Sequence, residues 1–233
     1  MIRPIVNASF SYIRPQIITK PPSFKGADED DDSPMLEVLK GLSPDELFGA
    51  LRMFSDAVIY DKTPYEYLPR DITVKSAQKA VQGAISRGSI DKDKIKSICD
   101  FGCGEGGGAT AIKEIFNPDF MVAVDIKDVW KESDKSIFKE CNGLDYLASG
   151  VDKFDLVTAC MLTPKVRPFD LLDAAHLSLN EGGKVLIFSD SVTTYRMETW
   201  LNTHGAEFDE FHVDDHGFKT IVVDKAEIEK TFT

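Results

Sequence analysis

The chain has 233 residues, of which 42% are hydrophobic and 28% are charged, and its formal net charge is −12. This length can bury one substantial core with a small appendage. No apolar run approaches the ~20 residues that a membrane-spanning helix requires, and the acidic balance argues against a broad nucleic-acid interface, which needs a basic face. We therefore expect neither a membrane nor a nucleic acid as a partner.

The four cysteines form no CxxC pair and no cluster with histidines at zinc spacing. This pattern predicts reduced thiols, no metal site and a cytoplasmic location.

Residues 1–27 carry basic residues and no acid. Such a start is compatible with an organelle transit peptide. Its prolines suit an irregular, extended path instead, and we favour an extended arm. An arm of this kind could exchange between the subunits of a homo-oligomer.

Five consecutive acids at 28–32 indicate a solvated linker, because like charges repel and extend the chain. Residues 33–60 and 72–88 have helical patterns, the second ending at Gly88. We predict that residues 1–90 form an arm, an acidic linker and a helical cap.

From residue 95 short apolar strands alternate with helices, which predicts a parallel sheet covered on both faces. Residues 207–225 contain two strand patterns around a glycine, which indicates an antiparallel hairpin. The predicted fold of residues 91–233 is α/β, a doubly wound, mostly parallel seven-stranded sheet with a terminal antiparallel hairpin. The expected strands are 95–102, 120–125, 136–141, 155–160 and 184–189, and the expected helices include 108–116 and 168–179.

The segment "ICDFGCGEGGG" at 98–108 follows the first of these strands. A glycine-rich turn there lets backbone amides and the next helix approach a ligand. Alone it is a weak signal, because Gly102, Gly104 and Gly107 also satisfy the dinucleotide pattern GxGxxG.

Polar residues at three successive strand ends separate the two interpretations. Asp100 would repel a pyrophosphate and attract an ammonium group. Asp125 can accept hydrogen bonds from both ribose hydroxyls, and Asn142 offers its amide to the edge of a base. Amino acid, ribose and base together describe S-adenosylmethionine (SAM).

The segments "DFGCGEG", "VAVD", "CNGLD", "FDLVTAC" and "LNEGGKVLIFSD" resemble the class I SAM-dependent methyltransferases. The resemblance covers residues 95–225 and leaves out residues 1–90. It implies that Asp100 and the turn hold the methionine part, Asp125 the ribose, and Asn142 the adenine, although the family often has aspartate at that place. The full implied cofactor set is Asp100, Phe101, Gly102, Gly104, Glu105, Gly106, Asp125, Ile126, Asn142, Gly143, Leu144 and Cys160.

The segment "ACMLTP" at 159–164, after the fourth strand, points to an acceptor only by exclusion. It lacks the Asn/Asp-Pro-Pro-Tyr pattern used on base amines and the acid used on ribose hydroxyls, and Cys160 lacks the preceding proline of cytosine methyltransferases. A small-molecule or peptide acceptor with an O, N or S nucleophile is the remaining expectation. Weak catalytic candidates are Tyr65, Tyr67, Arg70 and Asp190, although simple packing explains the aromatic residues equally well.

Two alternatives stay open. An aminopropyltransferase would need an aspartate after the fourth strand, and residues 158–164 contain none. A non-catalytic module that binds SAM or S-adenosylhomocysteine (SAH) and acts through its N-terminal surface fits the same motifs, and turnover separates it from an enzyme.

Overall fold

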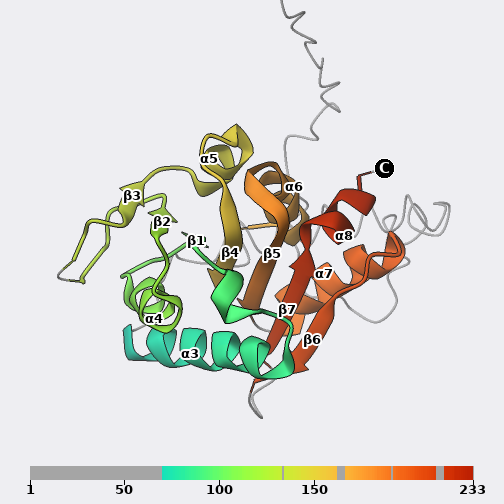
Figure 1. Cartoon of the computed structure of the whole chain (residues 1–233), viewed down its shortest axis with the longest axis horizontal. Coiled ribbons are helices and arrows are strands. Elements are labelled where there is room, and N and C mark those ends of the chain that lie inside the picture. Colours follow the sequence, from blue (N-terminus) through green and yellow to red (C-terminus); the bar gives the residue numbers. More distant parts are fainter. Residues whose placement is uncertain (1–69, 133, 162–165, 190, 214–217, 233) are drawn as a thin grey trace, which may run out of the picture. The chain divides into compact units, whose positions relative to one another are not determined.

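The computed structural model describes residues 70–132, 134–161, 166–189, 191–213 and 218–232. The predicted arm, acidic linker and helical segment 33–60 lie outside the described residues, as do Tyr65, Tyr67 and Asp190. In the described part, strands and helices alternate along the chain as the sequence predicts (Figure 1).

Seven strands of the described residues form one sheet in the order β3-β2-β1-β4-β5-β7-β6. Strands β1 to β5 are parallel, and β7 runs antiparallel to both β5 and β6. The predicted sheet and its antiparallel hairpin are therefore confirmed. The strands are β1 (Ser97–Phe101), β2 (Phe120–Asp125), β3 (Phe138–Glu140), β4 (Phe154–Cys160), β5 (Leu179–Ser189), β6 (Asp209–His212) and β7 (Lys219–Asp224).

Helices cover both faces of the sheet. Ile98 packs with α3 and α4, and the next residue, Cys99, packs with α5 to α8 on the other face, because successive strand side chains point to opposite faces. The helices are α3 (Arg70–Arg87), α4 (Gly107–Phe116), α5 (Gly143–Ser149), α6 (Pro168–Ser178), α7 (Ser191–Thr203) and α8 (Lys225–Lys230), with a short 3₁₀ turn at Lys92–Lys94.

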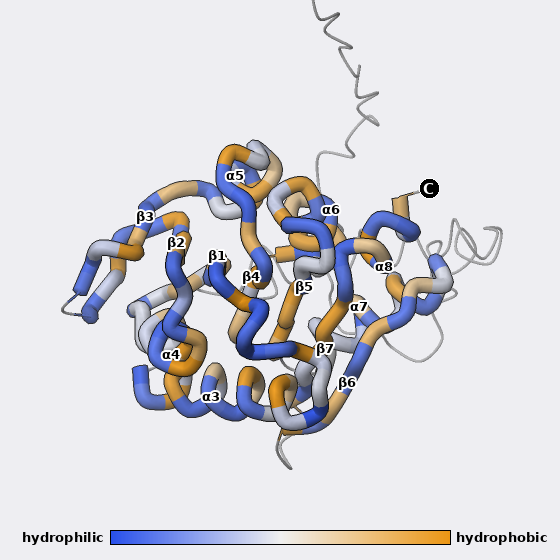
Figure 2. Tube along the Cα trace, viewed as in Figure 1, coloured by the Kyte–Doolittle hydropathy of each residue, from blue (hydrophilic) through white to orange (hydrophobic). Residues whose placement is uncertain are grey.

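Helix α3 matches the helix predicted at 72–88, and hydrophobic and hydrophilic residues alternate around it (Figure 2). Its small apolar face, Ala77, Ala80, Val81 and Ala84, is fully buried in the same cluster as Ile98. Although we expected this helix in the N-terminal cap, its packing makes it part of the layer that covers the sheet. The division into 1–90 and 91–233 otherwise stays a prediction.

Two strands differ in length from their predicted ranges. Strand β5 begins at Leu179, which pairs with Phe154 before the register shifts and Lys184 pairs with Leu156. Strand β3 is limited to 138–140, because Asp134 Oδ1 accepts a hydrogen bond from Ser136 N at 2.9 Å and ends the preceding loop in a turn.

None of the helices in the described ranges combines the length and apolar character that crossing a bilayer requires.

Candidate functional site

The ends of β1, β2 and β3 lie side by side at one edge of the sheet. Phe101 ends β1 next to β2, whose last residue is Asp125, and Thr158 of β4 lies opposite Asp100 on the other side of β1. The chain leaves β1 toward β2 and β3 and returns to β4 on the opposite side. Such a reversal of strand order is where open α/β sheets bind ligands.

Asp100 is almost completely enclosed at this edge, with 2% of its surface exposed. Thr158 Oγ1 donates a hydrogen bond to Asp100 Oδ1 at 2.6 Å. Burial raises the pKa of Asp100 to about 7, an effect that the Thr158 hydrogen bond opposes and the nearby Asp125 reinforces. At neutral pH the carboxyl is therefore partly protonated, and its repulsion of a pyrophosphate is weaker than the sequence predicts. A cation bound beside it would favour the ionised form.

Asp125 connects the end of β2 to the glycine-rich turn. Its Oδ2 accepts a hydrogen bond from Gly104 N at 2.9 Å, and its Oδ1 accepts one from Lys127 N at 3.3 Å. The residue is 5% exposed, and its carboxylate lies at the carboxyl end of β2, where open α/β sheets bind ligands. Asp125 thus shapes the turn in addition to the ribose role predicted for it.

The first half of the glycine run, Gly102 to Gly104, is a backbone turn that only glycine adopts readily. Gly102 has φ 69° and Gly104 has φ 52°. The backbone N–H groups of Gly102 and Cys103 both donate to Val124 O, at 2.9 and 3.1 Å. Gly102 is exposed, and apart from its chain neighbours no atom of the described residues lies within 4 Å of the position its Cβ would take. A ligand can approach this backbone directly.

The second half, Gly106 to Gly108, is buried and is approached by the protein itself. A Cβ on Gly106 would lie 2.6 Å from Cε3 of the Trp130 ring. A Cβ on Gly107 would lie 2.8 Å from Cγ of Arg70 and 3.0 Å from Oγ1 of Thr73, both on α3. These glycines therefore permit packing against the loop after β2 and against α3.

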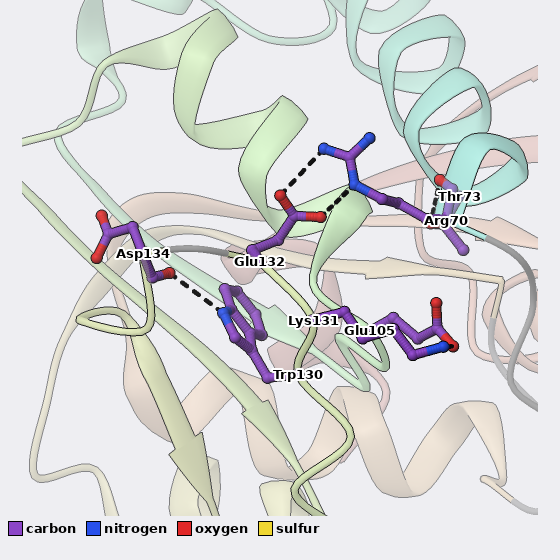
Figure 3. Close-up of polar contacts among 7 residues, drawn as sticks. All are labelled: Arg70, Thr73, Glu105, Trp130, Lys131, Glu132 and Asp134. Carbon is purple, nitrogen blue, oxygen red and sulfur yellow. Dashed lines mark hydrogen bonds and ion pairs between the residues drawn. The ribbon is translucent and has the colours of Figure 1, made fainter.

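Residues 130–132, which we call the clasp segment, follow β2, and the Trp130 ring packs on Gly106. Figure 3 shows the other two residues beside their partners, Lys131 beside Glu105 and Glu132 beside Arg70. Lys131 N donates to Glu105 O at 3.0 Å, and the Lys131 ammonium pairs with the Glu105 carboxylate. Glu132 pairs with the Arg70 guanidinium through two hydrogen bonds, that from Nη2 measuring 3.0 Å. Trp130 and Glu132 stand in no sequence motif and were not among the predicted site residues.

The corner after β3 carries the predicted adenine residues. Asn142 Oδ1 accepts a hydrogen bond from Leu144 N at 3.0 Å and caps α5. Gly143 is buried because the Phe101 ring occupies the space of a side chain, 2.6 Å from the position of a Cβ. Ile126, beyond Asp125, is 55% exposed and offers an apolar surface.

Of the four catalytic candidates, Arg70 alone lies within the described residues, and its guanidinium donates hydrogen bonds to Glu132. Cys160 ends β4 half-buried, and desolvation together with Asp100 raises the pKa of its thiol well above the usual value. A raised pKa disfavours the thiolate, which is the nucleophilic form of cysteine. All four cysteines are free.

No protein-family model matches the chain, and no curated protein matches its sequence. Among solved structures it is similar to a ribosomal protein L11 methylase from Lactobacillus delbrueckii subsp. bulgaricus, with 22% identity and a TM-score of 0.49 over 64% of this chain and 78% of that chain. It is also similar to the fibrillarin pre-rRNA processing protein of Methanococcus jannaschii, with 14% identity and a TM-score of 0.47 over 58% and 68%. A SAM-dependent methyltransferase from Archaeoglobus fulgidus shares 15% identity, with a TM-score of 0.45 over 63% and 94%.

The strand order β3-β2-β1-β4-β5-β7-β6 and the antiparallel pairing of β7 with β5 are observed in this chain itself and do not depend on these similarities. By that order, the chain has the seven-stranded, mostly parallel α/β fold that the resemblance to class I methyltransferases implies.

Proposed function

We propose that this protein is a SAM-dependent methyltransferase. The observation that carries the proposal is the edge formed by β1, β2 and β3, where Asp125, the exposed backbone of Gly102 and Asn142 lie in succession. The carboxylate suits the ribose of SAM, the exposed backbone suits its methionine part, and the amide suits its adenine.

The residues at this edge fit the cofactor in three respects. Asp125 ends β2 beside the glycine turn, and a carboxylate at that place can accept hydrogen bonds from ribose hydroxyls. The exposed Ile126 can cover the face of an adenine, and the amide of Asn142 can meet its edge. Gly102 leaves its backbone open to the methionine part.

When bound, SAM supplies a methyl group on a sulfonium, a carbon already activated for transfer. The protein then has to orient the acceptor in line and exclude water. Asp100, whose pKa of about 7 makes ionisation responsive to its surroundings, becomes a carboxylate more readily beside the ammonium of the methionine part. Binding would thus draw a proton from Asp100 into solvent near neutral pH.

The acceptor that we propose is a small molecule or a peptide with an O, N or S nucleophile. The basis is the sequence after β4, which has none of the motifs used on nucleic acids, and the net charge of −12. Burial raises the pKa of the Cys160 thiol, which disfavours a thiolate nucleophile at the end of β4.

Calorimetric titration of the full chain with SAM, SAH and NAD tests the proposal. Binding of the two adenosyl ligands without NAD supports it and justifies a screen of acceptors by release of homocysteine from the SAH formed. Binding of NAD alone would favour a dinucleotide site and overturn it. Binding of SAM without turnover on any acceptor would favour a non-catalytic module.

A further inference from the structure

The loop between β2 and β3 returns to the glycine run instead of passing straight to the next strand. It meets the run through the backbone hydrogen bond from Lys131 N to Glu105 O, at 3.0 Å, and through the Trp130 ring on Gly106. Glu132, next in the chain, reaches α3 at Arg70. Three consecutive residues thus join the turn, the loop and α3 (Figure 3).

Trp130 is fixed on Gly106 from several sides. Its ring lies 5.3 Å from that of Phe138 on β3, and its Nε1 donates to Asp134 O at 3.2 Å. Asp134 in turn pairs with Lys113 of α4 at 3.0 Å. Gly106 is the N-cap of α4 and has φ 92°. The Trp130 ring fills the space that a side chain at this position would take.

The Arg70–Glu132 pair is built differently from the other ion pairs of this loop. Both Nε and Nη2 of Arg70 donate to the two oxygens of Glu132, and only 12% of the Glu132 side chain is exposed, against 53% for Arg70. A bidentate pair fixes geometry as well as charge. A shielded carboxylate also loses more than an exposed one when its partner is removed.

Arg70 also touches the glycine run itself. Its Cγ and its backbone O lie 2.8 and 3.1 Å from the position that a Cβ on Gly107 would take, and its O accepts a hydrogen bond from Thr73 Oγ1 at 2.8 Å. Arg70 therefore packs on Gly107, while its guanidinium holds the segment whose Trp130 ring packs on Gly106.

We propose that Arg70 and Glu132 are positioning residues for the glycine turn. By holding the clasp segment against Gly106 and Gly107, the pair fixes the second half of the run and so the shape of the first half, Gly102 to Gly104, which meets the cofactor. This inference rests on the proposed function. It assigns Arg70 a role outside the chemistry, in place of the catalytic role expected from the sequence.

The tryptophans provide a direct readout of the clasp segment. The chain has two, Trp130 and Trp200. Trp200 packs against Phe169, and its buried Nε1 has no hydrogen-bond partner among the described residues. Trp200→Phe is therefore a conservative background in which the tryptophan emission reports Trp130 alone.

In this background we would compare Arg70→Gln, Glu132→Gln and the double variant in the full chain. The matched control is Glu181→Gln, which breaks the Glu181–Lys225 pair between β5 and α8. Two quantities are measured for each protein, the Trp130 emission maximum without ligand and the Kd for SAH by calorimetry.

We expect each single variant to shift the emission to longer wavelength and to weaken SAH binding by about three- to tenfold, since the Lys131–Glu105 contacts still hold part of the segment. The double variant should be no weaker than either single one, because both break the same pair. Glu181→Gln should leave both quantities unchanged.

An unchanged emission, or a shifted emission with unchanged SAH affinity, would overturn the positioning role, and so would additive losses in the double variant. Failure of the background protein to bind SAH would instead overturn the proposed function. The emission of the ligand-free variants would then still decide whether the pair holds the clasp segment.

Discussion

The two halves of the glycine run use the same residue type for opposite purposes. Gly102 and Gly104 bend the backbone with positive φ values, and at Gly102 the backbone is exposed. Gly106 and Gly107 are buried, and an indole ring and an arginine side chain occupy the space where their side chains would be. The first half offers its backbone to another molecule, and the second half offers it to the rest of this protein.

The shape of a glycine-rich turn therefore depends on the residues that pack against it. The open half has few contacts of its own besides Val124 O and Asp125 Oδ2. Its shape depends on these acceptors and on the closed half that follows. Substitutions in the buried half, Gly106 to Gly108, should therefore mainly lower the free energy of unfolding. Substitutions in the first half, Gly102 to Gly104, should mainly weaken ligand binding.

The largest effect is expected for Gly106→Ala. The positive φ and the overlap with the Trp130 ring should together lower the free energy of unfolding by about 2–5 kcal/mol. Gly102→Ala meets no atom within 4 Å and should lose only about 1–2 kcal/mol from its φ. Urea denaturation of the two variants measures the difference, and equal losses would contradict the division into two halves.

The next effect is the pH dependence that Asp100 contributes. Its pKa is raised from 3.8 to about 7 in the folded protein, so the folded state holds the proton more tightly than the unfolded state. Stability from this group is therefore present at low pH and is lost as pH rises, by about 3 kcal/mol between about pH 4 and about pH 7. Asp100→Asn keeps an acceptor for Thr158 and should remove this loss.

The measurement is the difference in unfolding free energy between the wild type and Asp100→Asn across that range, in which the other titrating groups cancel. The variant should become the more stable protein as pH rises. A difference that stays constant with pH would show that Asp100 titrates in the folded protein as it does in the unfolded chain.

A smaller effect is expected at Asp125, which serves both the ligand and the turn. Asp125→Ala removes the acceptor of Gly104 N and should weaken SAH binding by about 1–3 kcal/mol. Asp155 is a matched control, because its Oδ2 accepts hydrogen bonds from Lys96 N and Ser97 N, both at 2.9 Å, at the opposite end of β1. Asp155→Ala should reduce stability and leave the calorimetric Kd unchanged.

The smallest effect is expected at Asn142. Asn142→Ala removes the cap of α5 and should cost about 1 kcal/mol of stability. Asn142→Asp keeps an acceptor for Leu144 N and restores the residue that the resembling family often has, so stability and SAH affinity should be retained. Thermal unfolding and calorimetry of the two variants check this, and equal behaviour would show that the cap has no role.

The sequence predicts most of the sheet because its signals are local. Alternating apolar strands, the glycine stop of α3 and the polar residues at strand ends are each visible within a few positions. Tyr65, Tyr67 and Asp190 lie outside the described residues, so their assignment as catalytic candidates stays a prediction. Asp100 and Asp125 have different roles, since Asp100 is a buried acid with a raised pKa and Asp125 anchors the turn. These roles follow from the contacts with Thr158 and Gly104, which the sequence alone does not reveal.

The remaining features depend on contacts between residues that are distant in the chain. Glu132 and Arg70 are 62 positions apart, and no local pattern marks Trp130 as the partner of Gly106. Helix α3 was expected in a cap because it precedes the first strand. Its stripe of alanines was readable as a buried face, but not as a face that packs on α4 and β1.

The most direct test is to follow the backbone amides of the isotope-labelled full chain by NMR while SAH is added. The two-halves account predicts the largest chemical-shift changes at Gly102, Gly104 and Ile126, with much smaller changes at Gly107 and Gly108. Large changes confined to Gly107 and Gly108, with none at Gly102 and Gly104, would contradict it and would place the ligand on the half that the protein itself fills.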